Sequence, residues 1–333
     1  MRGHAVGLAA FVEGNGHTVR LLQDPAATGS EKRNSGLSYA DWLPTTWQQD
    51  AEQTAQAMDE IGPADWLIVD HYALGVDWER ACRRDGLRIL AIDDLADRAH
   101  DCDALLDQNL VANMDTRYQG RVGTGCAQLL GPAYALLRPD FAAQRRLLTP
   151  RTGEIGRLLV CFGGADPTNE TAKTIGAIRS LGTLALSVDI VIGAANPNSE
   201  SVARLCRELA GAELHRGANN IAELMRRADL AIGAGGVMSW ERCCLGLPTI
   251  AVDIAANQVG SLTALAEAGA ALYLGSAPTV GEWALAGSIQ AFLDDPARTR
   301  VMGEAAFALV DGGGSHRVAT RLVSMRHGTL GQE

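Results

Sequence analysis

Two pairs of glycines are the residues best placed for chemistry, because each pair lies between an apolar run and a stretch of helical periodicity. Gly163-Gly164 follows the run from Leu158 to Phe162, and Gly235-Gly236 precedes the helical pattern from Ser239 to Leu245. Glycine lets the backbone approach a ligand closely, and the N–H groups at a helix N-terminus bind anions. We therefore expect both pairs to contact one extended anion, such as a nucleotide diphosphate. The alternative is that the glycines only permit tight turns.

Three polar side chains accompany the second glycine pair. Glu241 lies about one turn into the predicted helix, where a carboxylate could accept both hydroxyls of a ribose. An acidic residue placed to complement the helix dipole is an equally good reading. Asn257 and Gln258 follow the apolar run from Thr249 to Val252 and could donate to a phosphate or a base. A helix-capping role for Asn257 stays open.

The first half of the chain offers two histidines for acid–base chemistry. Asp70-His71-Tyr72 places a carboxylate, an imidazole and a phenol after a buried apolar run, and His4 follows Gly3 at the start of a predicted helix. Either imidazole could act as a general base, because its ordinary pKa lies close to neutrality. For His71 we favour the alternative of a packed histidine that is hydrogen-bonded to a neighbouring carboxylate.

Neither a metal nor another cofactor is expected. Hard oxygen ligands at the strand ends would suit magnesium, but aspartates at such positions more often cap a helix or bind backbone N–H groups; the candidates are Asp70, Asp93, Asp94 and Asp97. The seven cysteines show no C-x-x-C spacing, which argues against a zinc site and favours reduced thiols.

Strand-like and helix-like segments alternate in both halves of the chain, on either side of a polar segment at Thr149 to Gly156. This alternation predicts an α/β protein with two Rossmann-like parallel-sheet domains. We place the domains at residues 1–148 and 157–315, with a C-terminal helix and tail at 316–333. The N-terminal domain opens on a predicted helix, Val6 to Val12, and the next predicted strand is His17 to Leu22.

Composition indicates a globular protein of 333 residues with 47% hydrophobic residues and a net charge of −10. The acidic balance argues against a nucleic-acid-binding surface, which needs clustered cations. No apolar run approaches the 18 or so residues of a membrane span, and the first residues lack a secretory pattern. We expect a cytoplasmic protein that is a monomer and whose partner is a small molecule.

Eight strings of the sequence, taken together, resemble the UDP-sugar hydrolases of pseudaminic acid biosynthesis. They occur in the family's order between about Val69 and Gln258: VDHYAL, IDDLADR, HDCDALLDQNL, LLGPAYALLRPDF, FGGADPTN, GAGG, SWERCCLGLP and ANQ. The resemblance implies a GT-B-like fold, with two domains facing a cleft and UDP held by the C-terminal domain. It also implies hydrolysis of UDP-2,4-diacetamido-2,4,6-trideoxy-β-L-altropyranose by water attack at the anomeric carbon, with inversion, release of UDP and no metal.

The same resemblance assigns roles to particular residues. His4 corresponds to the family's catalytic histidine, which would activate or orient the water, and Tyr72 corresponds to a tyrosine near the sugar. Glu241 corresponds to the ribose-binding acid, and Asn257 to a residue that contacts the nucleotide or the sugar. Gly235 and Gly236 would cradle the diphosphate.

The sequence departs from the family at its N-terminus. The family has a strand and a glycine-rich turn before the glycine–histidine pair, and an arginine three residues after the histidine, where this chain has Gly7. We therefore expect the first strand of the N-terminal domain to be missing and the activity to be impaired. Two rivals stay open: a GT-B glycosyltransferase that uses a UDP-sugar donor, and an inactive nucleotide-sugar-binding protein. The exact sugar and the role of the predicted loop at residues 24–50 are not readable from the sequence.

Overall fold

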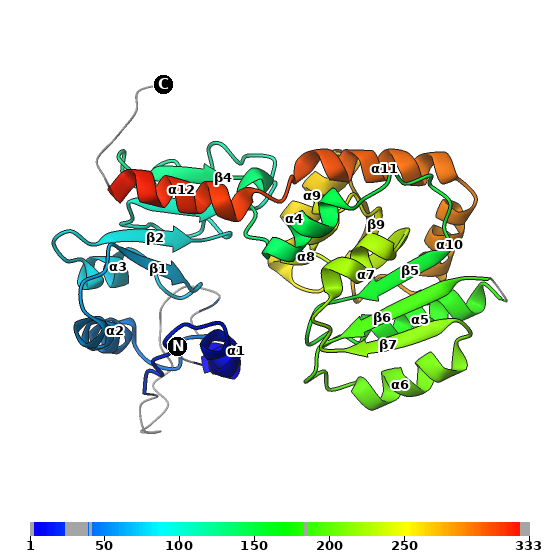
Figure 1. Cartoon of the computed structure of the whole chain (residues 1–333), viewed down its shortest axis with the longest axis horizontal. Coiled ribbons are helices and arrows are strands. Elements are labelled where there is room, and N and C mark those ends of the chain that lie inside the picture. Colours follow the sequence, from blue (N-terminus) through cyan, green and yellow to red (C-terminus); the bar gives the residue numbers. More distant parts are fainter. Residues whose placement is uncertain (1–2, 24–38, 40–41, 183–184, 327–333) are drawn as a thin grey trace. The chain divides into compact units, whose positions relative to one another are not determined.

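The computed structural model describes residues 3–23, 39, 42–182 and 185–326, and it divides the chain into two compact units (Figure 1). The first unit comprises Met1–Asp107, Asp115–Leu130 and Leu322–Glu333. The second comprises Gln108–Met114 and Gly131–Arg321. Each unit has a parallel sheet of its own, as the alternating sequence pattern predicts.

The first unit is built on a four-stranded parallel sheet in the order β1-β2-β3-β4. The strands are β1 (Trp66–Asp70), β2 (Arg88–Ile92), β3 (Ala104–Asp107) and β4 (Ala127–Leu130). Because all four run in the same direction, the residues that follow them meet at one edge of the sheet. Its helical elements are η1 (Gly3–Leu8), α1 (Ala9–Gly14), α2 (Trp47–Ile61), α3 (Val76–Cys82) and the end of α12 (Gly314–Arg326).

Side-chain hydrogen bonds set the start of α2 and hold α2 against α3. The Thr46 side chain accepts a hydrogen bond from the Gln49 N–H and so caps α2, and Gly62 ends the helix. The Trp78 indole of α3 donates to the Asp50 carboxylate of α2 at 2.9 Å, in a buried contact. The pair fixes the two helices to each other while satisfying two buried polar groups.

The second unit contains a six-stranded parallel sheet in the order β10-β9-β8-β5-β6-β7. The strands are β5 (Arg157–Cys161), β6 (Ser187–Ile192), β7 (Ala212–Arg216), β8 (Leu230–Ala234), β9 (Thr249–Asp253) and β10 (Leu272–Ser276). The chain builds outward from β5 in one direction and then returns to build outward from β8 in the other. The neighbouring carboxyl ends of β5 and β8 are therefore the topological switch point, where open α/β sheets bind ligands.

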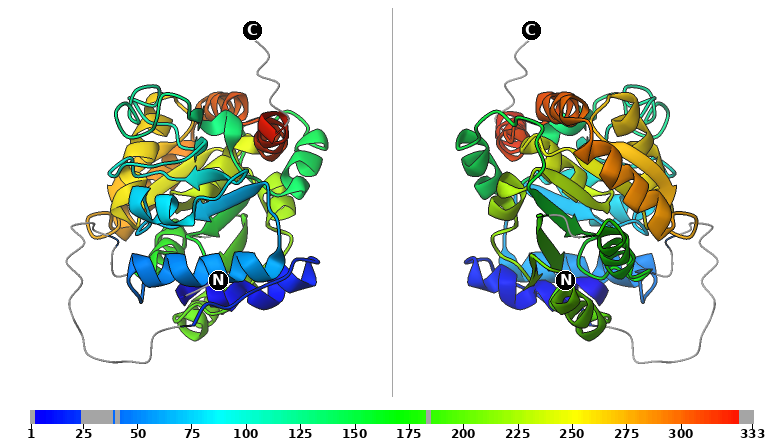
Figure 2. Two further views of the ribbon diagram at one scale, coloured as in Figure 1. Left: turned by 90° about the vertical axis from the view of Figure 1, so that its left-hand side faces the viewer. Right: turned by 90° about the vertical axis from the view of Figure 1, so that its right-hand side faces the viewer.

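Helices cover both faces of this sheet (Figures 1 and 2), which explains why its inner strands are almost wholly buried. One face packs against α5 (Glu170–Ser180), α6 (Ser199–Glu208) and α10 (Glu282–Leu293). The other packs against α4 (Pro139–Arg146), α7 (Ile221–Arg227), α8 (Val237–Cys244) and α9 (Val259–Glu267). The remaining helices are α11 (Pro296–Leu309) and the short η3 (Pro132–Tyr134) and η4 (Ala256–Gln258).

The predicted α/β class with two parallel sheets is confirmed, but two elements of the first unit differ from the prediction. His17–Leu22 is not a strand, because no described strand pairs with it and Leu21 is exposed. The described residues before Trp66 contain no strand at all. The short strand β4, Ala127–Leu130, was not predicted.

The compact units also divide the chain differently from the predicted ranges 1–148, 157–315 and 316–333, which stay a prediction. Residues 131–148 group with the second unit, because α4 packs there. Phe141 of α4 is fully buried in the core of the second unit, and Arg145 donates to the Cys244 carbonyl oxygen at 2.7 Å. The last helix, α12, is shared: its final residues group with the first unit, where the Trp66 indole donates to the Leu322 carbonyl oxygen.

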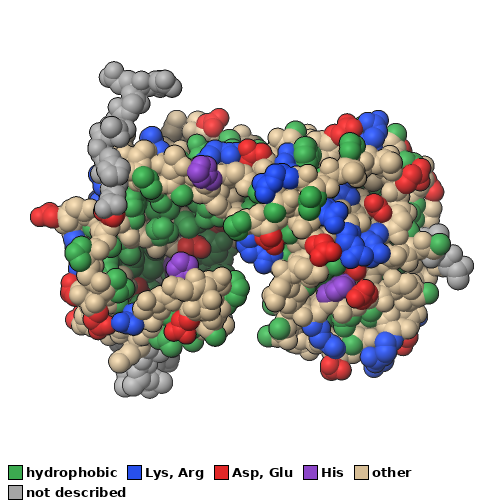
Figure 3. Space-filling model, viewed as in Figure 1, with side chains coloured by type: hydrophobic (Ala, Val, Ile, Leu, Met, Phe, Trp, Pro, Cys, Tyr) green, Lys and Arg blue, Asp and Glu red, His purple; other side chains and the backbone are tan. Residues whose placement is uncertain are grey.

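The surface and the helix lengths bear on possible partners. On the face shown in Figure 3, acidic and basic side chains are interspersed over the second unit, and the whole chain has a net charge of −10. Within the described part of the chain, no helix is both long enough and apolar enough to span a bilayer.

Candidate functional site

The glycine turn after β8 presents an uncapped helix N-terminus. Gly236 has φ +82° and is the N-cap residue of α8, with no side chain bonded to the first N–H groups of that helix. A positive φ strains any residue with a Cβ, so glycine suits this position. The first turn of α8 thus has backbone donors and the positive end of the helix dipole available for an anion.

Gln258 holds this turn from the neighbouring connection. Its side-chain oxygen accepts from the Gly235 N–H at 3.2 Å and from the Ile254 N–H at 3.1 Å, and so joins the segments after β8 and β9. A Cβ on Gly235 would lie 2.9 Å from the Gln258 Cβ, which is too close for two carbon atoms, so these two segments can approach each other only with glycine at this position. The Gln258 amide nitrogen has no hydrogen bond within the described residues and is a donor that a ligand could use. Asn257, half-buried in η4, is brought to the same place.

Glu241 supplies a carboxylate on the first turns of α8. The residue is half-buried, and its carboxylate has no hydrogen-bond partner among the described residues. Burial raises its pKa, while the cationic Arg138 and Arg242 oppose that shift. A carboxylate that is desolvated yet unbonded is well suited to accept hydroxyl groups from a bound ligand.

Arg242 places a buried cation beneath the turn, and sequence reasoning missed it. The residue is 2% exposed, and its guanidinium donates to the Ala234 carbonyl oxygen at 2.6 Å and to the Ser239 hydroxyl at 3.3 Å. Burial lowers its pKa, and its Nε has no hydrogen-bond partner in the described part of the chain. The available signal was an arginine directly after Glu241 in an otherwise apolar helix, since a buried charge usually has a role.

The first glycine turn is placed differently from the second. Cys161 of β5 lies opposite Gly233 of β8, so Gly163-Gly164 follows the strand next to β8 at the switch point. However, the N-terminus of α5 is already capped: the Asp166 carboxylate accepts from the Glu170 and Thr171 N–H groups, each at 2.9 Å. The two glycine turns are therefore not equivalent as anion sites. Of the two helices that follow them, only α8 has first-turn N–H groups that no side chain of the described residues caps.

In the first unit, Tyr72 follows β1 and lies in an aromatic group. Its ring centroid is 4.8 Å from that of Tyr39 and 5.4 Å from that of Trp42. His71 is half-buried, and its Nδ1 accepts from the Ala73 N–H at 3.1 Å. Desolvation is the main cause that lowers the pKa of His71. The hydrogen-bond partners of its ring are thus backbone groups, at Ala73 and Trp42, where we expected a carboxylate.

An ion pair at the ends of β1 and β2 holds the segment that carries Tyr72. Arg98 contacts the Asp93 carboxylate at 2.7 Å and donates to the Leu74 and His71 carbonyl oxygens at 2.7 and 3.3 Å. The Tyr118 hydroxyl donates to the same carboxylate at 2.9 Å. Burial alone would raise the pKa of Asp93, but Arg98 and the Ala96 N–H lower it overall. A carboxylate with these partners is a poor metal ligand.

His4, the predicted base, lies in η1, and its side chain is outside what the structure describes. Its catalytic role therefore stays a prediction.

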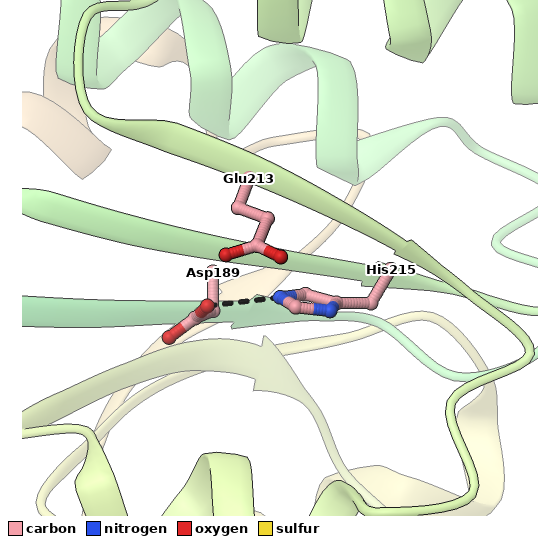
Figure 4. Close-up of side chains that lie close together, drawn as sticks. All are labelled: Asp189, Glu213 and His215. Atoms are coloured by element: carbon pink, nitrogen blue, oxygen red, sulfur yellow. Dashed lines mark hydrogen bonds and ion pairs between the residues drawn. The ribbon is translucent and has the colours of Figure 1, made fainter.

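One group in the described chain has the residue types and spacing of a metal site, although no metal was expected. Asp189, Glu213 and His215 of β6 and β7 have ligand atoms that all lie within 4.8 Å of one another (Figure 4). His215 Nε2 is 2.9 Å from one oxygen of Asp189, and Arg157 donates to the other at 2.9 Å. Because Arg157 already neutralises the central carboxylate, the arrangement is better explained as an Arg157–Asp189 ion pair that also holds the His215 ring.

Comparison with known proteins supports the resemblance stated from the sequence. The chain is 30% identical over 193 residues to the spore coat polysaccharide biosynthesis protein SpsG of Bacillus subtilis, a match that covers 58% of this chain and 57% of that protein. It is 27% identical over 204 residues to the UDP-2,4-diacetamido-2,4,6-trideoxy-beta-L-altropyranose hydrolase of Campylobacter jejuni, covering 61% of this chain and 71% of that protein. The chain thus spans little more than half the length of SpsG. No protein-family model matches it.

Solved structures decide the fold. Acinetobacter baumannii MurG superposes with a TM-score of 0.62 at 14% identity, over 95% of this chain and 88% of that one. The Staphylococcus aureus MnaA–UDP co-structure gives 0.59 at 13% identity, over 100% of this chain and 97% of that one. The chain has the GT-B fold. The predicted GT-B-like fold is thereby confirmed.

Proposed function

We propose that this GT-B protein hydrolyses a UDP-sugar and releases UDP and the free sugar. The observation that carries the proposal is the group in the second unit: the uncapped N-terminus of α8, the unbonded carboxylate of Glu241 and the Gln258 amide, all at the switch point of the sheet. These are the donors and the acceptor that a diphosphate and a ribose need. The similarity to a named UDP-sugar hydrolase agrees with this chemistry.

Each element of the UDP site has a definite part in this proposal. The α8 N-terminus and the Gly235-Gly236 backbone bind the diphosphate, and the buried Arg242 adds positive potential from below. Glu241 accepts the ribose hydroxyls. Asn257 and the Gln258 amide donate to the nucleotide or the sugar, and Gly163-Gly164 borders the site from β5.

The proposed reaction is displacement at the anomeric carbon. The oxygen of a water molecule forms a bond to that carbon as the bond to the UDP oxygen breaks, with inversion, and UDP leaves with the electron pair. His4 takes the proton of the water or orients it, and Tyr72 lies near the sugar. The UDP trianion that leaves is stabilised by donors fixed before the reaction, so no metal is needed.

We further propose that the substrate is UDP-2,4-diacetamido-2,4,6-trideoxy-β-L-altropyranose, which would place the protein in pseudaminic acid biosynthesis and hence in a route such as flagellin glycosylation. This rests on the similarity to the Campylobacter jejuni protein. A cytoplasmic monomer that acts on a soluble nucleotide sugar is part of the same proposal.

A glycosyltransferase is the second candidate, because a glycosyltransferase of Rickettsia africae shares the fold. Incubating the full chain with the UDP-sugar alone separates the possibilities, with UDP and free sugar measured by mass spectrometry and the anomer by NMR. We expect stoichiometric UDP and free sugar of inverted configuration. UDP release that requires an added acceptor would establish the transferase, and UDP-sugar binding without turnover would establish an inactive binding protein.

A further inference from the structure

Cys102 and Cys126 form a pair of thiols that the UDP-binding residues do not involve. Their sulfur atoms lie 3.6 Å apart in the first unit, just before β3 and β4. The described residues include all seven cysteines, each of them a free thiol, and among these residues the Cys102–Cys126 hydrogen bond is the one contact between two thiols. Because no C-x-x-C spacing occurs in the sequence, the proximity of the two sulfur atoms arises only from folding.

The backbone around the pair holds the two cysteines at a suitable separation. The Ala127 N–H donates to the Asp103 carbonyl oxygen at 2.9 Å, so the residues that follow each cysteine are bonded directly. Asp103 is itself anchored to Ile89 of β2 at 2.8 Å. Ala104 pairs with Ala127, so the two cysteines are one position out of register. A strand spacing of about 4.8 Å and a rise of about 3.3 Å per residue place their Cα atoms roughly 5.8 Å apart, within the roughly 4.4–6.8 Å that a disulfide spans.

The two thiols differ in a way that suits a two-step oxidation. Cys126 is half-buried and open to a small oxidant, whereas Cys102 is 6% exposed and contacts the Cys126 sulfur from its buried side. The hydrogen bond between them lowers the pKa of Cys126 and raises that of Cys102. By contrast, burial raises the pKa of Cys82, Cys161, Cys243 and Cys244 to about 11 or 12. Because Cys126 is the more exposed of the two, its sulfur is the one that an oxidant reaches first.

We propose that Cys102 and Cys126 are a redox-reactive dithiol that a hydroperoxide converts to an intramolecular disulfide and a dithiol reductant restores. The Cys126 thiolate attacks one peroxide oxygen; an S–O bond forms, the O–O bond breaks, and the leaving hydroxide takes up a proton to become water. The Cys102 sulfur then attacks the sulfenic sulfur, an S–S bond forms, and the S–O bond breaks to release a second water. Both thiols are oxidised and one hydrogen peroxide is reduced.

The closed ring would enclose the connection between β3 and β4. That connection carries Arg117 and Tyr118, which bond to the Asp107 carboxylate at 2.7 and 3.2 Å. A cross-link at its base reduces the conformational freedom of the unfolded chain, so the oxidised protein should unfold at a higher temperature, by about 5 °C.

Peptide mapping of the full-length protein tests the proposal. The reduced protein is treated with a few equivalents of hydrogen peroxide, blocked with N-ethylmaleimide and digested with trypsin. We expect the peptides 99–117 and 122–145 to appear joined, with the loss of two hydrogen atoms, because trypsin does not cleave between Arg138 and Pro139. The number of thiols that can be titrated in the denatured protein should fall by two per molecule, and dithiothreitol should restore it.

Two variants control the assignment. Cys126→Ser should abolish the joined peptides, whereas Cys206→Ser, which removes a buried thiol of α6, should leave them unchanged. Absence of the 99–117/122–145 product from oxidised wild-type protein overturns the proposal, whatever the variants do. So does a product in which either cysteine is joined to another partner.

Discussion

At the scale of single residues, Glu241 is the side chain whose position tests the UDP site most directly. Its carboxylate has no hydrogen-bond partner among the described residues, so a bound ribose would supply the bonds that it lacks. We expect Glu241→Gln to weaken UDP binding about tenfold, the loss of roughly 1.4 kcal/mol expected for a hydrogen bond to a charged group. Isothermal titration calorimetry with UDP measures this.

A ligand without the 2′-hydroxyl identifies the partner of the carboxylate. The wild-type protein should bind 2′-deoxy-UDP more weakly than UDP, and Glu241→Gln should reduce that preference. Glu200→Gln, at a fully exposed position on α6, should bind both ligands as wild type does. If Glu241→Gln lost the same factor of affinity for UDP and for 2′-deoxy-UDP, the carboxylate would not bind the ribose 2′-hydroxyl.

The raised pKa of Glu241 also makes two pH effects predictable. As the pH falls through that pKa the carboxylate is protonated, so UDP affinity of the wild type should fall more steeply than that of Glu241→Gln, in which the titration of the UDP phosphate remains. Stability changes in the opposite sense. A pKa that is higher in the folded than in the unfolded state means that ionisation of Glu241 lowers the free energy of unfolding as the pH rises.

Glu241→Gln should therefore be more stable than wild type above the raised pKa, and the difference should vanish below the unfolded pKa of about 4.3. Thermal unfolding of both proteins from pH 4 to pH 8 checks this. A variant that is less stable than wild type at pH 8 would contradict the assignment of a desolvated carboxylate.

At the scale of elements, the turn between β8 and α8 depends on close approach of the backbone. A Cβ on Gly235 would lie 2.9 Å from the Gln258 Cβ and 3.1 Å from Leu262, and Gly236 has φ +82°. We expect Gly235→Ala to displace the turn and to weaken UDP binding more than tenfold, because the N–H groups move away from the phosphates. Calorimetry gives the affinity, and chemical denaturation gives the stability.

Gly287→Ala in α10 is the matched control for this change. A Cβ there meets nothing within 4 Å, so alanine should leave UDP affinity unchanged and stabilise the helix by up to about 1 kcal/mol. If Gly235→Ala binds UDP as the control does, the turn does not contact the ligand.

The elements of the fold also differ in how far the sequence could predict them. Strands such as β1 and β8 were predictable because their apolar runs are continuous and end in turns. Strand β4 was missed because Ala127–Leu130 is short and mostly only half-buried. The switch between β5 and β8 was not readable, because it arises from the pairing of strands that are distant in sequence. The Arg98–Asp93 pair was not readable, because it depends on how the connection after β2 folds back onto the segment after β1.

At the scale of the whole molecule, the UDP site we propose belongs entirely to the second unit. Its residues lie after β5, β8 and β9, over cores that are separate from the core of the first unit. Ligand binding stabilises whatever it contacts, by about 2.7 kcal/mol when the ligand is present at 100 times its dissociation constant. Binding of UDP alone should therefore slow amide exchange locally, without changing the stability of the other sheet.

Hydrogen–deuterium exchange of the full chain measures this distribution. With saturating UDP, we expect slower exchange in the segments at residues 235–242 and 254–262, and unchanged exchange in β1 to β3. Glu241→Gln at the same UDP concentration should show a smaller effect in the same segments, because less of the protein is bound. Protection that appears mainly in the first unit would place the nucleotide on the other sheet, since amides are protected where hydrogen bonds and burial increase.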